Sequence, residues 1–266
     1  MNIQNKNGLN QLSVQPDTHP RTVAFIQARM SSNRLPGKVL QDIAGQPMLA
    51  WVVERARLAK SLDEVVVATS TDATDDTVAS LCQHAGIPYY RGDLDDVLDR
   101  LYQAAQAHQA ETIVRLTGDC PLIDPSVIDE TVSAFYESYV DFAANRLPPP
   151  WKRTYPIGLD TEVCSFAALE RAWKEADQPQ QREHVLPYLY EEPGRFTIRV
   201  IDHDPDYGHY RWTVDTLEDL DLVRSIFQHL DDPKNFSWLE VIEIFKAHSE
   251  LAEINAHVEH KKHGEK

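Results

Sequence analysis

The chain has 266 residues, 42% of them hydrophobic, which is enough to build one α/β domain with a large core. Its formal net charge of −16, from 42 acidic and 26 basic residues, argues against extended nucleic acid binding. No uninterrupted apolar run approaches the ~20 residues of a membrane helix, so we expect no membrane-spanning segment.

The pattern of apolar residues predicts strands and helices in alternation. Residues 1–20 are polar and lack an apolar segment, so we expect a disordered extension there and not a secretory signal. Strands are then expected at 23–28, 64–69, 88–91, 112–117 and 140–144, and amphipathic helices at 47–60, 73–85, 94–108 and 125–137. Such alternation predicts an α/β fold whose mostly parallel sheet carries helices on both faces.

The rhythm changes after about residue 145. The prolines of 147–156 exclude a central strand and indicate a lid or a partner-contact loop. Segments 159–164, 196–202 and 209–214 are expected to form strands of a different arrangement, a small inserted β arm that pairs subunits. The predicted organisation is therefore a domain at 21–248, with a dimerisation or lid insertion near 146–162 and 195–212, followed by a polar C-terminal tail at 249–266.

Three cysteines, Cys82, Cys120 and Cys164, lie far apart and form no C-x-x-C motif. Such thiols fit a reducing compartment and carry no zinc signature. We therefore expect a cytoplasmic protein.

The most informative segment is VAFIQARMSSNRLPGKVL, residues 23–40, in which an apolar strand runs into a turn that carries Arg29, Arg34 and Lys38. Ligands of α/β proteins bind where such strands end. Guanidinium groups, an ammonium and backbone amides would together hold a triphosphate. Basic residues of surface loops often only face water, but three cations within ten residues of so acidic a chain favour an anion site. The absence of G-x-x-x-x-G-K-[ST] and G-x-G-x-x-G argues against a phosphate-loop ATPase and a dinucleotide dehydrogenase.

This segment resembles the signature of the sugar-activating cytidylyltransferases, most closely the spore coat polysaccharide cytidylyltransferase-like group, relatives of CMP-Kdo and CMP-sialic acid synthetases. The resemblance continues in order through VVVATS at 65–70, RGDLDDVLDR at 91–100, VRLTGDCPLID at 114–124, YPIGLDTEV at 155–163, REHVLPY at 182–188 and WTVDTLEDL at 212–220. It implies a Rossmann-like, GT-A-like nucleotidyltransferase and a homodimer. The implied reaction activates an anionic sugar with CTP and releases pyrophosphate. Ser31 stands where many relatives have glycine, and a positive φ angle there would strain a serine.

Two aspartates are candidate ligands of a divalent metal. Asp119 follows the apolar strand TIVRLTG, and Asp215 ends the strand YRWTV. A turn aspartate bonded to its own backbone would also explain Asp119, and a residue that favours a helix dipole would explain Asp215. Thr216 and Asp219 match a capping pattern, which gives Asp219 a structural role. The resemblance implies a metal aspartate in each motif, and hard carboxylate and phosphate oxygens suit Mg²⁺.

The resemblance also implies a set of site residues. The catalytic residues would be Arg29, Lys38, Asp119 and Asp215, with the two aspartates as the metal ligands. The nucleotide would contact Gln27, Ala28, Arg29, Met30, Ser31, Arg34, Lys38, Arg91, Gly92, Thr117 and Gly118. The sugar would contact Arg115, Asn145, Gly158, Asp160, Glu162, Arg182, Glu183 and His184.

Simpler interpretations remain open for several of these residues. Arg115 lies inside a strand pattern and needs a partner, which is either a sugar anion or a buried carboxylate such as Asp141. Asp160 and Glu162 share one face of an extended segment, where they would reach sugar hydroxyls or face water as in any exposed strand. The carboxylates of 93–96 fit a helix N-terminus, and we prefer that structural interpretation.

Two alternatives to a cytidylyltransferase also remain open. A metal-dependent glycosyltransferase would use a nucleotide sugar and usually carries a D-x-D triplet at the end of a strand. DPD at 204–206 is such a triplet, but it lies in a predicted turn. A non-catalytic nucleotide-binding protein would bind CTP and form no product.

For residues 182–184 a structural interpretation also remains open, namely a surface ion pair between Arg182 and Glu183 beside a partly buried His184.

Overall fold

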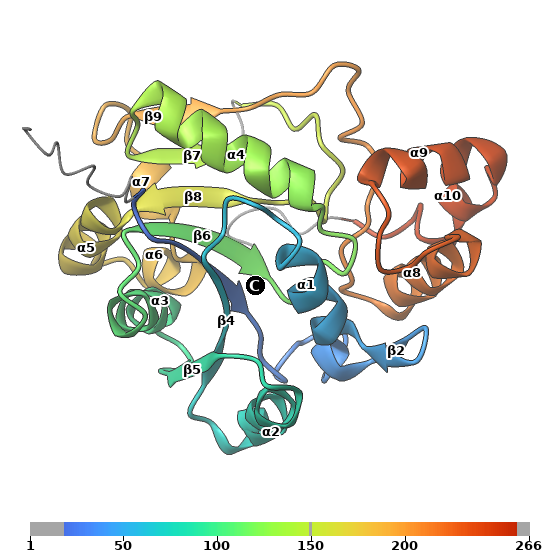
Figure 1. Cartoon of the computed structure of the whole chain (residues 1–266), viewed down its shortest axis with the longest axis horizontal. Helices are drawn as coiled ribbons and strands as arrows, with labels where there is room; N and C mark the ends of the chain where they lie inside the picture. Colours follow the sequence, from blue (N-terminus) through green and yellow to red (C-terminus); the bar gives the residue numbers. More distant parts are fainter. Residues whose placement is uncertain (1–18, 149–150, 260–266) are drawn as a thin grey trace, which may run out of the picture.

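The structure, a computed structural model, describes residues 19–148 and 151–259 and is built around a seven-stranded sheet (Figure 1). The strand order is β5-β4-β1-β6-β8-β7-β9. These strands are β1 (Thr22–Gln27), β4 (Glu64–Ser70), β5 (Tyr89–Gly92), β6 (Thr112–Thr117), β7 (Phe142–Ala144), β8 (Glu162–Ser165) and β9 (Ile198–Val200). A separate two-stranded sheet joins β2 (Asp42–Ile43) to β3 (Gln46–Pro47).

Helices connect the strands and cover the sheet. The helices before β8 are α1 (Met48–Ala56), α2 (Asp76–Ala85), α3 (Val97–Ala107) and α4 (Pro125–Ser138), with short 3-10 helices η1 (Lys38–Leu40) and η2 (Ala73–Asp75). Those after it are α5 (Phe166–Glu175), α6 (Pro179–His184), α7 (Pro187–Tyr190), α8 (Leu217–His229), α9 (Trp238–Ala247) and α10 (Leu251–Ile254).

The sheet is mostly parallel, as the alternating pattern predicted. β1 lies between β4 and β6 and is parallel to both, and β5 is parallel to β4. β8 is antiparallel to its two neighbours, β6 and β7, while β9 is parallel to β7. The carboxyl ends of β1, β4 and β6 therefore meet at one edge, which is where a ligand site of an α/β protein is expected.

The prediction of a separate β arm needs correction. Segments 159–164 and 196–202 supply β8 and β9, and both belong to the main sheet. Val163 and Cys164 of β8 are fully buried, because the strand has apolar neighbours on both faces of the sheet. Segment 209–214 forms no strand and contributes a single bridge, between Ile157 and Arg211.

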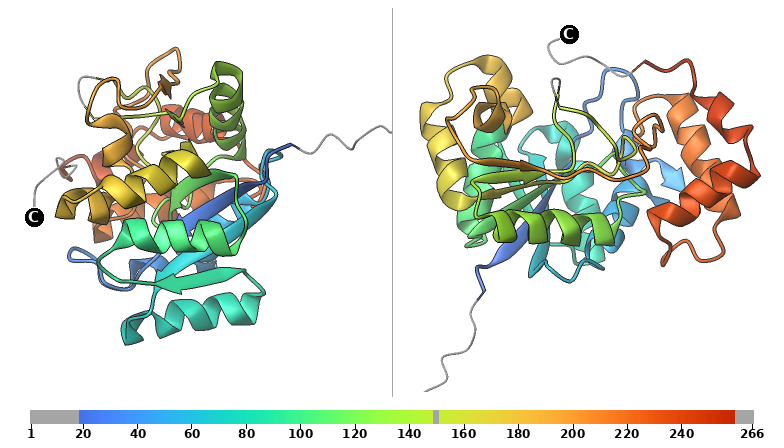
Figure 2. Two further views of the ribbon diagram at one scale, coloured as in Figure 1. Left: turned by 90° about the vertical axis from the view of Figure 1, so that its left-hand side faces the viewer. Right: turned by 90° about the horizontal axis from the view of Figure 1, so that it is seen from above.

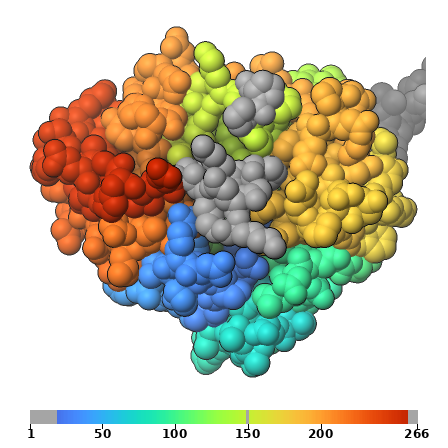
Figure 3. All heavy atoms as spheres, turned by 180° about the vertical axis from the view of Figure 1, so that it is seen from behind, coloured from blue at the N-terminus to red at the C-terminus, as the bar shows by residue number. Residues whose placement is uncertain are grey.

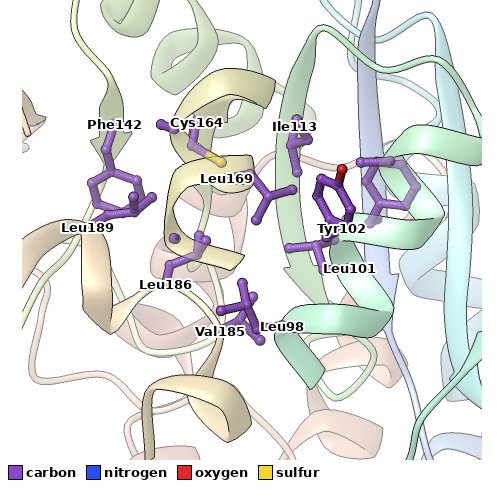
Figure 4. Packing of buried hydrophobic residues seen from close by; sticks show 14 of the residues in the cluster. Leu98, Leu101, Tyr102, Ile113, Phe142, Cys164, Leu169, Val185, Leu186 and Leu189 are labelled. Carbon is purple, nitrogen blue, oxygen red and sulfur yellow. The ribbon is translucent and has the colours of Figure 1, made fainter. Parts of the chain in front are cut away.

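Apolar residues fill both faces of the sheet. Val23 and Phe25 of β1 pack on the face that α3 and α5 cover, and the alternate residues Ala24 and Ile26 pack against α1 and α4. Figure 2 shows these helical layers from two further sides. In the close-up of the first face, Cys164 lies among aliphatic and aromatic side chains (Figure 4).

Helices α8, α9 and α10 enclose a third apolar cluster beside α1 and the β2–β3 hairpin (Figure 1). Leu251 of α10 is only 4% exposed, and the Asn255 amide donates a hydrogen bond to the Arg211 carbonyl at 3.1 Å. The packed chain thus continues past residue 248, where the predicted tail was to begin. The predicted N-terminal extension falls outside the described residues apart from 19 and 20. None of the helices found in residues 19–148 and 151–259 is long and apolar enough to cross a membrane.

Candidate active site

The basic turn begins where β1 ends and closes on itself before Lys38. The Gly37 amide donates to the Met30 carbonyl at 2.9 Å, and Gly37 adopts a left-handed φ of 71°. Glycine is the residue that takes this conformation without strain. Ser31 is not among the described non-glycine residues with positive φ, so the serine fits the turn without strain. The Met30 amide in turn donates to Asp75 Oδ1 at 2.6 Å, which ties the turn to the short helix η2 after β4.

Lys38 reaches across the edge of the sheet to both candidate metal ligands. Its Nζ donates to Asp119 Oδ2 at 2.6 Å, to Asp215 Oδ1 at 2.8 Å and to the Val214 carbonyl at 2.9 Å. The Lys38 side chain is only 11% exposed. Although burial disfavours the charged form, the two carboxylates raise the pKa of Lys38 above its ordinary value. Lys38, Asp119 and Asp215, which lie far apart in the sequence, therefore form one charged cluster.

The second carboxylate oxygen of Asp215 is also paired with cations. Arg34 lies 2.7 Å and Arg211 lies 2.8 Å from Asp215 Oδ2. Burial alone would raise the pKa of Asp215, but Lys38, Arg34 and Arg211 together lower it to about 2. Asp215 is therefore ionised throughout the physiological pH range.

This low pKa predicts a pH-dependent contribution to stability. The pKa of Asp215 is lower in the folded state than its ordinary value of 3.8. Its contribution to stability is therefore complete above pH 3.8 and is lost as the pH falls towards 2. We expect the difference in unfolding free energy between the wild type and Asp215→Asn to shrink by about 1 kcal/mol between pH 6 and pH 3. Urea titrations at both pH values would measure it, and a difference that stays constant or grows would contradict it.

Arg211 is a member of this cluster that the sequence patterns did not single out. Besides Asp215 it binds Asp219, with Arg211 Nε 2.9 Å from Asp219 Oδ1. Asp219 accepts from the Thr216 amide at 3.1 Å and completes a capping box on α8, as predicted. Arg211 therefore joins a helix cap to the candidate metal ligand. The only signal for it was a single arginine inside the apolar run YRWTV.

The strand ends beside the basic turn approach one another closely. The Gly118 amide donates to the Gln27 carbonyl at 2.8 Å, and a Cβ at Gly118 would lie 3.1 Å from Cβ of Ala28. Thr117 Oγ1 is 3.2 Å from Sγ of Cys120. Burial and the nearby Asp119 raise the pKa of the Cys120 thiol well above its ordinary value, so this sulfur stays protonated beside the carboxylate.

Arg91 and Gly92, predicted to contact the nucleotide, shape the neighbouring loop. The Arg91 guanidinium donates to the Ser70 carbonyl at 2.7 Å and pairs with Asp76 at 2.7 Å. A Cβ at Gly92 would lie 2.9 Å from Cγ of Arg100, so glycine leaves room for that buried arginine. Burial and the charge of Arg29 lower the pKa of Arg100 to about 10. Arg29 of the basic turn thus lies near Arg100.

The acidic segment 93–96 has the structural role that we preferred. Asp96 caps α3 by accepting from the Asp99 amide at 2.9 Å. Arg182 binds the same carboxylate, with Nη2 2.6 Å from Asp96 Oδ2, and donates to the Trp173 carbonyl at 2.7 Å. Arg182 therefore clamps α6 to α3, while the adjacent Glu183 and His184 are exposed.

A second charged cluster lies beyond Gln27. Arg115 forms an ion pair with Glu162 across the β6–β8 register, and Arg115 Nε donates to Gln27 Oε1 at 3.0 Å. The partner expected for Arg115 was a sugar anion or a carboxylate such as Asp141. The residue found is Glu162, whereas Asp141, which directly precedes β7, accepts a hydrogen bond from the Thr197 amide at 2.8 Å.

Asp160 completes the second cluster with two arginines that the sequence patterns missed. Arg146 Nε is 3.1 Å from Asp160 Oδ2, and Arg153 Nη2 is 3.0 Å from the same oxygen. The nearby Asn145 binds the backbone of the segment before β8, since its side-chain amide donates to the Leu159 carbonyl at 2.7 Å. Together the cluster contains three guanidinium groups and two carboxylates.

Gly158 contacts backbone. It has a φ of 111°, and a Cβ there would lie 2.8 Å from the Thr213 amide nitrogen. The segment that leads to Asp215 therefore packs directly on Gly158.

The Asp119–Asp215 pair fits the predicted Mg²⁺ in donor type and number. No group of three or more His, Cys, Asp or Glu residues able to hold a metal occurs in the part of the chain that the structure describes. Mg²⁺ in nucleotide sites is commonly held by one or two carboxylates together with substrate phosphates. The ammonium of Lys38 already lies between both carboxylates, which shows that the pair stabilises a cation.

The DPD triplet at 204–206, the mark considered for a glycosyltransferase, lies in a loop and not at the end of a strand. There Asp206 accepts a hydrogen bond from the Gly208 amide at 2.7 Å.

On the molecular surface, the segment with the basic turn (blue) lies beside the C-terminal helices (orange and red), as Figure 3 shows.

A family model described as "Cytidylyltransferase" matches residues 23–259. The chain belongs to this family. The cytidylyltransferases are nucleotidyltransferases, which agrees with the charged site at the carboxyl edge of the sheet.

Individual cytidylyltransferases and their relatives are similar over most of the chain. The spore coat polysaccharide biosynthesis protein SpsF of Bacillus subtilis is 30% identical, over 86% of this chain and 95% of that protein. The 3-deoxy-manno-octulosonate cytidylyltransferase of Anaeromyxobacter dehalogenans is 31% identical, over 76% and 96%. A cytidylyltransferase structure from Leptospira borgpetersenii has a TM-score of 0.82 and 32% identity, over 88% and 97%.

Proposed function

We propose that this cytidylyltransferase activates an anionic sugar, either a keto-sugar acid or a sugar phosphate, with CTP and releases pyrophosphate. The observation that carries the proposal is the contact of Lys38 with both Asp119 and Asp215 at the edge where β1 and β6 end. Cations that could hold a triphosphate and carboxylates that could hold its metal ion belong there to one site. The name of the SpsF relative supports a role in polysaccharide biosynthesis.

In this proposal the acceptor hydroxyl attacks the α-phosphorus of CTP. A new oxygen–phosphorus bond forms, the bond from the α-phosphorus to the oxygen that bridges the α- and β-phosphates breaks, and pyrophosphate leaves. The proton of the hydroxyl passes to water. Arg29, Arg34 and Lys38 hold the triphosphate and stabilise the charge of the leaving pyrophosphate. Mg²⁺ held by Asp119 and Asp215 would neutralise phosphate oxygens and lower the pKa of the attacking hydroxyl.

The second cluster supports an anionic acceptor. Arg115, Arg146 and Arg153 face two carboxylates, so a carboxylate or phosphate of the sugar would balance the remaining positive charge. Glu162 and Asp160 would accept hydrogen bonds from sugar hydroxyls. The keto-sugar acid named for one relative has such a carboxylate.

A pyrophosphate-release assay tests the proposal. The protein is incubated with CTP and Mg²⁺ together with each of several keto-sugar acids and sugar phosphates. We expect release with at least one acceptor and less release with UTP, ATP or GTP. A glycosyltransferase would consume a nucleotide sugar without releasing pyrophosphate, and a nucleotide sensor would bind CTP without product. Binding of CTP with no release from any acceptor would contradict the proposed activity.

A further inference from the structure

In the structure, each N–H group of the Lys38 ammonium already has an acceptor. A lysine ammonium has three N–H groups. Asp119, Asp215 and the Val214 carbonyl accept one each, at 2.6, 2.8 and 2.9 Å. At least one of these bonds must break before Lys38 can bind a triphosphate.

The charges around this ammonium are already balanced. Among residues 19–148 and 151–259, Lys38, Arg34 and Arg211 pair with Asp119, Asp215 and Asp219, so three cations face three carboxylates. The side chains of Asp119 and Asp215 are 23% and 18% exposed, so solvent screens these interactions only in part. A free divalent cation would enter a neutral cluster and meet the repulsion of Lys38.

A triphosphate changes this balance. It brings several negative charges to the turn that carries Lys38, and the flexible four-carbon stem lets the ammonium turn towards them. The two carboxylates would then lose their counter-ion as a divalent ion arrives with the phosphates. The turn itself need not unfold, because its closure depends on backbone contacts of Met30 and Gly37.

We propose that Lys38 is the resident counter-ion of the Asp119–Asp215 pair, so that the nucleotide-free protein excludes free divalent cations and admits one only with the triphosphate. This inference rests on the proposed function for the identity of the nucleotide. It adds an order of events, in which lysine and metal exchange places on the same carboxylates.

Titration of the nucleotide-free protein with Mn²⁺ alone tests the exchange, with bound ion measured by electron paramagnetic resonance. We expect Lys38→Met to bind one Mn²⁺ at least about tenfold more tightly than the wild type, because a positive charge within a few ångströms has been removed. Lys174→Met is the matched control, since Lys174 is 56% exposed and paired with Glu170. It should bind Mn²⁺ like the wild type.

Further variants assign the site and guard against misfolding. Adding Asp119→Asn to Lys38→Met should abolish the tight Mn²⁺ site. If Lys38→Met does not unfold cooperatively on heating, Lys38→Gln replaces it. In the wild type, a non-hydrolysable CTP analogue should bring Mn²⁺ onto the protein, as shown by a change in the resonance beyond that of the metal–analogue complex.

Equal Mn²⁺ affinity of the wild type and Lys38→Met would overturn the counter-ion role, as would a tight site that survives Asp119→Asn. Both results are independent of the pyrophosphate assay. Failure of that assay with every acceptor would instead remove the proposed activity and leave the metal titration interpretable.

Discussion

Replacement of Asp119 by asparagine should lower the rate of pyrophosphate release by a factor on the order of 100 or more. Asparagine preserves the shape of the side chain and an oxygen for Lys38, which now lies 2.6 Å from Asp119 Oδ2. It removes the negative charge that would hold a divalent ion beside the α-phosphate. The effect should therefore fall on kcat and leave the fold intact. Replacement of Lys38 by alanine should lower the rate by a similar factor, since the variant lacks the cation that we propose stabilises the leaving pyrophosphate.

The control for Asp119→Asn is Asp221→Asn on α8. The Asp221 side chain is 67% exposed and pairs only loosely with Arg224, at 3.9 Å. We expect wild-type rates from this variant under the same concentrations of CTP, Mg²⁺ and acceptor. An Asp119→Asn protein with a cooperative thermal transition and undiminished pyrophosphate release would refute the proposed role of Asp119.

The first half of the fold was predictable because its signals are local. The strand predicted at 112–117 has the bounds of β6, and the predicted strand at 23–28 differs by one residue at each end from β1. Both are short apolar runs buried on two faces, and each is followed by polar turn residues. Helix α2 begins later than predicted because Asp72 first caps the short helix η2.

The second half was less predictable because its order in the sheet is not sequential. β8 has only four residues and inserts between β6 and β7 in the antiparallel direction. Its position depends on contacts with segments far away in the chain, such as the Arg115–Glu162 pair. The residue pattern of 159–164 carries no information about its neighbours β6 and β7. The pattern alone therefore predicts a separate arm for this segment.

The same distinction applies to the site. Asp119 beside Lys38 follows from strand order, because β6 lies next to β1 and parallel strands end at one edge. Asp215 reaches the site on an irregular segment, which the Val214 amide attaches to the Asp119 carbonyl at 2.9 Å. Arg211 then holds Asp215 in place by donating a hydrogen bond to its Oδ2 at 2.8 Å. Its place after the predicted strand YRWTV and the family resemblance both pointed to Asp215, but nothing in the spacing of WTVDTLEDL indicated its contact with Arg211.

Gly158 links this irregular segment to the main sheet, which leads to the second prediction with a large effect. Gly158→Ala should lower the free energy of unfolding by about 3 kcal/mol, because alanine rarely adopts a φ near 111° and must fit a confined space. The added Cβ would lie 2.8 Å from both the Trp212 carbonyl carbon and the Thr213 nitrogen. Since both atoms belong to backbone, neither neighbour can turn aside.

Gly194→Ala is the matched control for this substitution. Gly194 also has a positive φ, of 84°, but no atom lies within 4 Å of an added Cβ. The Gly194→Ala variant should lose only about 1 kcal/mol of unfolding free energy. Urea unfolding would measure this free energy in both variants. Gly158→Ala should in addition slow pyrophosphate release, because the displaced peptide directly precedes Val214 and Asp215. Equal losses of stability in the two variants would contradict the steric argument. A normal rate in a destabilised Gly158→Ala protein would show that Asp215 keeps its position without this contact.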